Sequence, residues 1–175
     1  MKVIVLSKRW LIVLWIIVAI LLILVFLSQG QDSDYAMYTL PTEELVVVID
    51  PGHGGFDSGA LGPSGIREDV LNLQVAKKLE KLLNDNGAQT IMTRTDNDAL
   101  AMRKADDMKK RVDIIKESSP DIVVSIHMNK FGQSKYYGAQ TFYMAGSTEG
   151  ERLAESVQVQ LRENLIEGNN RQIKA

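Results

Sequence analysis

The sequence contains only two histidines, and each of them follows a short apolar stretch. His53 lies in the glycine-rich stretch DPGHGGFDSG, just after the apolar residues 45–49, and His127 directly follows DIVVSI at residues 121–126. Both apolar stretches are predicted to be strands. Ligands bind at the carboxyl ends of the strands in an open α/β sheet. We therefore expect the two imidazoles to share one site at that edge of a sheet.

Three kinds of site are known to use glycine-rich stretches like this one. A dinucleotide fingerprint would need a third glycine where the chain has Asp57, and a carboxylate there would face the pyrophosphate. A phosphate-binding P-loop would need a Gly-Lys-Ser/Thr ending, which the stretch lacks. The third kind is a metal site, in which glycines let the backbone turn tightly and let a ligand approach. The two histidines favour the metal site.

Two imidazoles and one carboxylate would complete a zinc site with an open position for water, although the same donors also suit iron or cobalt. Glu68 opens the first predicted helix, directly after the glycine-rich stretch, so its carboxylate can point back towards His53. An acid favoured by the helix dipole would explain the same residue. Asp57 and Asp69 are alternative third ligands. The chain has no cysteine, which excludes disulfides and thiolate ligands.

Strands and helices alternate in the pattern of apolar residues. Four strands are predicted, at residues 45–49, 88–93, 121–126 and 138–144. Three helices are predicted, at residues 68–84, 101–115 and 154–165. The strands at 45–49 and 121–126 are apolar throughout, as expected when helices cover both faces of a parallel sheet. The expected fold class is α/β, with an open, mostly parallel sheet and helices on both faces.

A single transmembrane helix is predicted before this sheet. Residues 10–27 are all apolar, and as a helix they would span about 27 Å, close to the ~30 Å hydrocarbon core. Lys2, Lys8 and Arg9 precede the stretch, which places the N-terminus in the cytoplasm and the rest of the chain outside. A cleaved signal peptide is the alternative. We favour an uncleaved anchor because the apolar stretch is long and no small-x-small cleavage site follows it.

The chain is therefore divided into a cytoplasmic stub with its membrane anchor at 1–27, a linker at 28–44 and a catalytic domain at 45–175. Over the whole chain, 22 acidic residues outnumber 20 basic ones. Three of the basic residues lie before the anchor, so the remainder is more acidic still. Nucleic acid is excluded as a partner, because its binding depends on neutralising phosphates with Lys and Arg.

Four motifs occur in order after residue 45: IDPGHGGFDSGALGPSGIREDVLNLQVA, IMTRTD, DIVVSIHMNKF and GAQTFY. Together they resemble the zinc-dependent N-acetylmuramoyl-L-alanine amidases of the amidase-3 family. The resemblance implies Zn²⁺ as cofactor, with His53, Glu68 and His127 as its ligands. It also implies peptidoglycan as substrate, cleaved at the amide that joins the muramic acid lactyl group to L-alanine.

Within the family, the anchor and the stretch RKADDMKKRV resemble the sporulation and germination amidases. That resemblance implies a catalytic domain outside the cytoplasm, in the cell wall or between the forespore membranes, acting on the spore cortex. The need for a regulatory partner protein is left open.

The resemblance departs at the C-terminal end of the chain. The family's second catalytic glutamate, the general base, lies in a motif like Leu-Val-Glu-Val-Gly-Phe, and no such motif occurs in the 175 residues. We therefore expect a fragment or a prematurely terminated product that lacks the base and the last strand and helix. Two other functions are open: an inactive zinc-bearing domain that binds the wall or a partner, and a different zinc hydrolase on the same scaffold.

Residues around the expected site carry further predictions. Arg94 follows a strand and is expected either to contact substrate or to pair with a nearby aspartate at the surface. Asn129 is expected to orient its loop or to touch glycan, and Asp50 to support His53 through its second ring nitrogen. The basic run at residues 109–111 is expected to be the solvated face of its helix.

Overall fold

The computed structural model describes residues 42, 44–130 and 137–175. The predicted anchor and almost all of the linker lie outside these residues, so the division of the chain at residues 27 and 44 stays a prediction. In the part that is described, no helix is long and apolar enough to cross a membrane.

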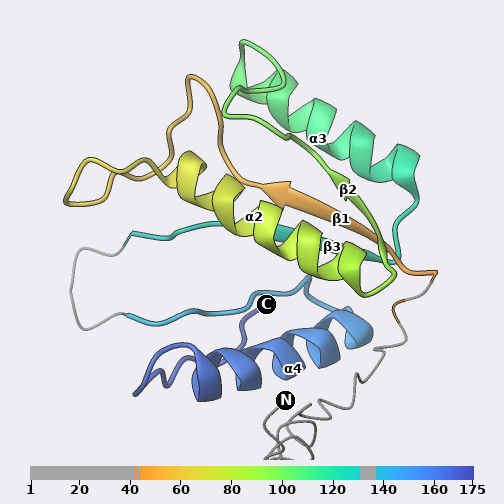
Figure 1. Ribbon diagram of the computed structural model, residues 1–175, viewed down its shortest axis with the longest axis vertical. Helices are drawn as coiled ribbons and strands as arrows, with labels where there is room; N and C mark the ends of the chain where they lie inside the picture. The colour runs from red at the N-terminus through yellow and green to blue at the C-terminus, as the bar shows by residue number, and fades with distance from the viewer. Residues whose placement is uncertain (1–41, 43, 131–136) are drawn as a thin grey trace, which may run out of the picture.

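The centre of the fold is a parallel sheet of three strands in the order β2-β1-β3 (Figure 1). The strands are β1 (Val46–Pro51), β2 (Gln89–Met92) and β3 (Ile122–Ile126). Val47 of β1 is paired with Thr90 on one side and with Ile122 on the other. Because β1 is central, the loop that follows it emerges between the carboxyl ends of its two neighbours. The first three predicted strands are thereby confirmed.

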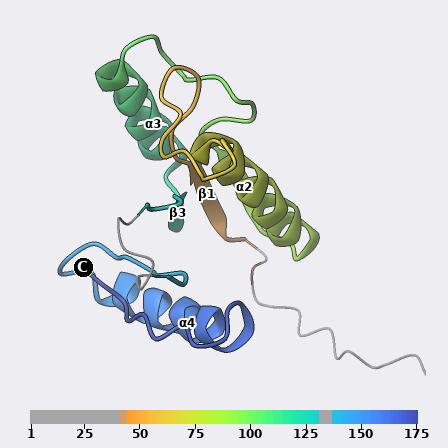
Figure 2. The same ribbon diagram turned by 90° about the vertical axis from the view of Figure 1, so that its left-hand side faces the viewer.

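Two helices cover opposite faces of this sheet, as the two views show (Figures 1 and 2). They are α2 (Glu68–Asp85) and α3 (Lys104–Ser118). On the α2 side, Val47 and Ile49 of β1 form a buried apolar cluster with Ala76 of the helix. The predicted α/β class with helices on both faces is confirmed.

The α3 side of the sheet is packed differently from the sequence prediction. The buried residues of α3 are Asp107 and Arg111. Met108 and Val112, two of the apolar residues whose spacing predicts this helix, are 50% and 41% exposed. The basic run at 109–111 is therefore not wholly a solvated face, because Arg111 points inward to Asp50 of β1. An ionic contact between α3 and β1 therefore lies within this face.

The fourth predicted strand, at 138–144, is wrong. This segment forms only one isolated bridge, between Phe142 and Lys174. The buried amide of Gln158 accepts a hydrogen bond from the Thr141 N–H and donates one to the Ala139 carbonyl. These backbone groups are the ones that a sheet neighbour would need, so the amide replaces a strand partner. Gln158 belongs to α4 (Thr148–Asn164), the last predicted helix.

Candidate metal centre

The loop after β1 has an unusual backbone that is fixed by its neighbours. His53 has a φ of 64°, in the left-handed region, and Gly54 and Gly55 follow with φ of 141° and 58°. A left-handed conformation costs a residue with a side chain about 1–2 kcal/mol. The Gly52 N–H donates to the Ile126 carbonyl at 3.0 Å, which ties the loop to the end of β3. This geometry turns the imidazole of His53 towards the edge of the sheet.

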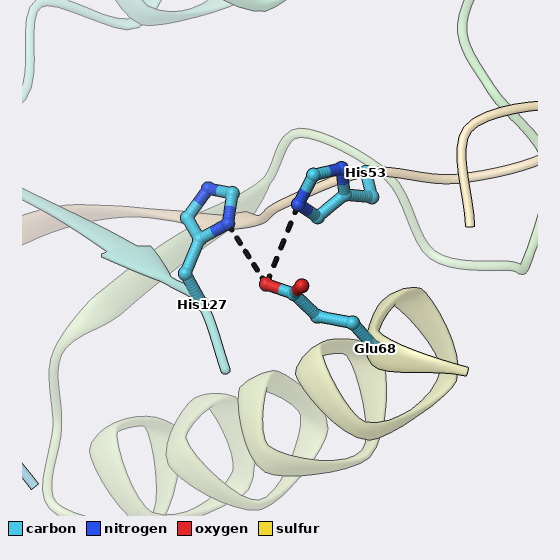
Figure 3. A group of neighbouring side chains, drawn as sticks. All are labelled: His53, Glu68 and His127. Atoms are coloured by element: carbon cyan, nitrogen blue, oxygen red, sulfur yellow. Dashed lines mark hydrogen bonds and ion pairs between the residues drawn. The ribbon is translucent and has the colours of Figure 1, made fainter. Parts of the chain in front are cut away.

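Three side chains meet at that edge (Figure 3). The Oε1 atom of Glu68 lies 3.3 Å from His53 Nε2 and 3.2 Å from His127 Nδ1. One donor atom from each of the three residues lies within 4.8 Å of the other two. The structure thus brings together the two histidines and the glutamate, each from a different part of the chain. Asp69 is not in this group, because Arg67 holds it in a two-point ion pair.

Glu68 is placed by the loop that precedes α2. The Glu68 N–H, at the start of the helix, donates to the Ala60 carbonyl at 2.9 Å. In return, the carboxylate accepts the Ala60 N–H at 2.8 Å and the Met128 N–H at 2.9 Å. Burial alone would raise the pKa of Glu68, but these two backbone donors and the nearby His53 lower it below its ordinary value. The side chain is therefore a carboxylate at neutral pH.

The second ring nitrogen of His53 is held by Asp57. The Nδ1 atom lies 3.0 Å from Asp57 Oδ2, and Lys104 Nζ lies 3.0 Å from the same oxygen. Burial alone would raise the pKa of Asp57, but hydrogen bonds from His53 and Lys104 hold it well below its usual range. When the imidazole is neutral, this contact keeps its proton on Nδ1, so the lone pair of Nε2 faces Glu68.

The prediction that Asp50 supports His53 is wrong. Asp50 accepts hydrogen bonds from the Thr93 hydroxyl at 2.7 Å, from Arg111 Nη1 at 2.7 Å and from the Ser125 hydroxyl at 3.0 Å. Its side chain projects from β1 among these groups, whereas the tight glycine turn brings Asp57 back to the imidazole. Burial alone would raise the pKa of Asp50, but the Thr93 hydrogen bond and the charge of Arg111 lower it.

Two glycines leave room for the site side chains. A Cβ atom at Gly52 would lie 2.1 Å from Cε1 of the His127 ring. A Cβ atom at Gly59 would lie 2.7 Å from both Glu68 Oε2 and His53 Cδ2. Real Cβ atoms essentially never approach other heavy atoms this closely. The glycine-rich composition of the loop is therefore explained in part by close approach of the backbone to the three side chains.

The three residues fit a metal ion. Ligands at 2.0–2.1 Å from a tetrahedral zinc ion are about 3.3 Å apart, and both contacts of Glu68 Oε1 have that length. The donor set, two imidazole nitrogens and one carboxylate oxygen, is one that catalytic zinc sites use. The side chain of His127 is 43% exposed, so one side of the group is open to solvent. Such an arrangement can hold a metal and still admit a substrate.

The predictions for Arg94 and Asn129 have different outcomes. Arg94 is 3% exposed, and it donates to the carbonyls of Pro51, Gly52 and Asp69. It is therefore neither placed to contact a substrate nor paired at the surface. Asn129 is exposed, two residues after His127, and its role stays a prediction.

Comparison with known proteins identifies a family and related amidases. The family model Amidase_3, described as N-acetylmuramoyl-L-alanine amidase, matches residues 47–175. The germination-specific N-acetylmuramoyl-L-alanine amidase of Bacillus subtilis (strain 168) is 37% identical over 155 residues, which cover 83% of this chain and 65% of that protein. The chain thus spans a little less than two thirds of that relative.

The structure is also similar to solved structures. The CwlD amidase from Clostridioides difficile, in complex with the GerS lipoprotein, matches with a TM-score of 0.70 and 36% identity over 74% of this chain and 71% of that one. N-acetylmuramoyl-L-alanine amidase AmiC2 of Nostoc punctiforme matches with a TM-score of 0.61 and 31% identity, over 75% and 69% of the two chains.

Proposed function

Because the chain belongs to the Amidase_3 family of N-acetylmuramoyl-L-alanine amidases, we propose that it takes part in zinc-dependent hydrolysis of peptidoglycan. The bond cleaved is the amide between N-acetylmuramic acid and the L-alanine of the stem peptide. The observation that carries the proposal is the contact of one carboxylate oxygen of Glu68 with both imidazoles at the open edge of the sheet.

His53, Glu68 and His127 are the proposed zinc ligands. Bound zinc supplies Lewis-acid polarisation of the scissile carbonyl and activates water for attack. The protein's own part is to keep each donor atom ready. Asp57 retains the proton on the far side of the His53 ring, and two backbone N–H groups keep Glu68 ionised and immobile. The exposed side of His127 faces solvent, from which a large polymer substrate can approach.

The proton transfer requires a further group. Both oxygens of Glu68 already accept backbone hydrogen bonds, so it is poorly placed to act as a general base as well. In the part of the chain that the structure describes, the group of donor residues contains no second carboxylate. We assign the base to the glutamate of the family's late motif, which these 175 residues lack. A general base contributes typically 10²–10⁴-fold to the rate.

The cellular setting is proposed from the relatives. We place the catalytic domain outside the cytoplasm, anchored by residues 10–27, with the spore cortex as substrate. The similarity to a germination-specific amidase supports the cortex as substrate. The structural similarity to an amidase solved with a lipoprotein supports a lipoprotein partner.

The test measures zinc content and muropeptide cleavage on the full 175-residue chain. Glu68→Ala is compared with Glu149→Ala, which removes a carboxylate that is 82% exposed. A third protein carries the wild-type chain followed by the C-terminal segment of the Bacillus subtilis relative. We expect one zinc per wild-type chain, a loss of zinc in Glu68→Ala only, and release of stem peptides with a free L-alanine amino group by the extended protein only.

Each other outcome contradicts one part of the proposal. A folded wild-type chain that takes up no zinc would exclude the metal site. Cleavage of a bond within the peptide, rather than at the lactyl amide, would indicate a different zinc hydrolase. Cleavage by the 175-residue chain alone would show that a residue within it acts as the base.

A further inference from the structure

We propose that Arg111 and Arg94 are positioning residues, which hold the backbone of His53 in the conformation that metal binding needs. This inference rests on the proposed metal site and adds a function for two buried cations that neither contact the three donor side chains nor face solvent.

Three consecutive carbonyls, at the last residue of β1 and the two residues after it, all accept hydrogen bonds from these arginines. The Pro51 carbonyl accepts from Arg94 Nε at 2.8 Å and from Arg111 Nη1 at 3.0 Å. The Gly52 carbonyl accepts from Arg94 Nη2 at 3.0 Å, and the His53 carbonyl accepts from Arg111 Nη2 at 2.6 Å. The loop therefore turns its carbonyls towards the two guanidinium groups, and this fixes the orientation of each peptide up to and including that of His53.

Both arginines are almost completely buried, at 3% exposure each. A buried cation without partners would be strongly destabilising. Arg111 is neutralised by Asp50 and Asp107, each at 2.7 Å. Burial alone would lower the pKa of Arg111, but these two carboxylates raise it, so the side chain keeps its charge. The carboxylates anchor one side of the guanidinium while its remaining N–H groups serve the loop.

The contact with His53 is the decisive one. The left-handed backbone of His53 is unfavourable in itself, and such conformations persist only where the surroundings determine them. Arg111 Nη2 donates to the carbonyl of that same residue. Without this hydrogen bond, one end of the peptide after His53 is released, while its other end is still held by the Gly54 N–H, which donates to the Asp57 carbonyl at 2.9 Å. The peptide can then tilt, and the imidazole would move relative to Glu68.

Lysine cannot replace arginine in this role. Arg111 makes four hydrogen bonds in different directions from one planar group, to two carboxylates and two carbonyls. A lysine ammonium is a compact point charge with three donors on a flexible stem. A lysine at this position would still neutralise Asp50, but it would not reach both ends of the loop at once.

The experiment measures metal binding by full-length variants. We compare Arg111→Met, Arg111→Lys and Arg94→Met with Arg103→Met. Arg103 is the matched control, since it precedes the same helix, is 80% exposed and pairs with Asp106. Zinc affinity is determined by competition with a chelator, and the absorption spectrum of the Co²⁺-loaded protein reports the coordination geometry. Circular dichroism without metal reports folding.

We expect zinc affinity to fall about 10–100-fold in Arg111→Met, in the range measured when groups behind metal ligands are removed. The Co²⁺ spectrum should change with it, which a loss of stability alone would not cause. Arg111→Lys should lie between Arg111→Met and the wild type, Arg94→Met should weaken binding, and Arg103→Met should bind like the wild type.

A folded Arg111→Met protein with wild-type zinc affinity and an unchanged Co²⁺ spectrum would overturn the inference. If Arg111→Met does not fold, Arg111→Lys decides, because it retains the charge that Asp50 and Asp107 require. Wild-type affinity in Arg111→Lys would then overturn the inference. Failure of the wild-type chain to bind any metal is a different result, which refutes the proposed metal site itself.

Discussion

The loop after β1 and the segment at 138–144 satisfy their buried backbone groups in different ways. At the loop, the charged side chains of Arg94 and Arg111 donate to the carbonyls. At 138–144, the neutral amides of Gln158 and Asn169 donate to the Ala139 carbonyl at 3.1 and 3.0 Å. Both solutions hold the segment close to a helix. Only the first requires two aspartates to balance its charge.

The two regions differ in whether charged groups are buried in them. Burying ions costs more than burying amides, and a buried ion pair is often no more stabilising than apolar packing would be. The ionic solution is found next to His53, where the backbone is left-handed and several carbonyls converge. Neutral amides serve where the backbone only has to be kept extended. Charge is therefore found where orientation matters most.

The largest effect is expected from a substitution of Gly52, in the loop after β1. Gly52→Ala would place a methyl group 2.1 Å from the His127 ring, and that ring can swing out into solvent. We expect zinc affinity to fall by more than the ~10–100-fold typical when a group behind a metal ligand is removed, with the fold retained, because one ligand is lost. Gly62→Ala is the control, since its nearest neighbour, the Ile66 carbonyl oxygen, would lie at 3.5 Å. Equal zinc affinities in the two variants would contradict this account of Gly52.

A smaller effect is expected at the segment 138–144. Gln158→Ala removes the amide from α4 and leaves the Thr141 N–H without its acceptor, while Asn169 still serves the Ala139 carbonyl. We expect the free energy of unfolding to fall by about 1–3 kcal/mol, as measured by urea denaturation. Zinc affinity should stay at the wild-type value. A tenfold loss of zinc affinity would show that the two regions are coupled.

The smallest effect is expected at the edge of the loop after β1. Lys104 is 68% exposed, and its contact with Asp57 is an ion pair open to solvent. Such pairs contribute about 0–1 kcal/mol. We therefore expect Lys104→Met to reduce stability and zinc affinity only slightly, by less than Arg111→Met does. Isothermal titration with zinc would measure the affinity. A loss as large as that of Arg111→Met would show that His53 is held mainly by the contact of its ring with Asp57, and not by Arg111.

The sequence predicts the apolar framework and the neighbourhood of the site well. The apolar runs before His53 and His127 indicate two strands, and parallel strands necessarily bring their carboxyl ends together. The place of Glu68 at the start of a helix makes it a candidate ligand but leaves Asp57 and Asp69 as alternatives, and the family resemblance selects it. The histidines need only local patterns and one rule of topology, and the structure brings the three side chains together.

The supporting residues could not be predicted in the same way. The burial of Arg111 depends on Asp50, which lies 61 positions earlier in the chain, and a Lys-Lys-Arg run on a helix is usually solvated. Residues 138–144 have the composition of a strand, yet a strand also needs a neighbour, and the amide of Gln158 takes that place. The sequence suggests Asp57 as an alternative metal ligand, but the glycine turn places it against the Nδ1 atom of His53. Each of these outcomes depends on tertiary contacts.

The central place of β1 has a consequence for biosynthesis. The strand is made first, yet one of its neighbours is β3, and the hydrogen bond from Ser125 to Asp50 joins residues 75 positions apart. Contacts between such distant residues form late and slow the folding of a domain. During synthesis, the loop that carries His53 therefore lacks β3 and His127 until residues 122–127 have been made. The proposed metal site can therefore be completed only after residue 127 has been made.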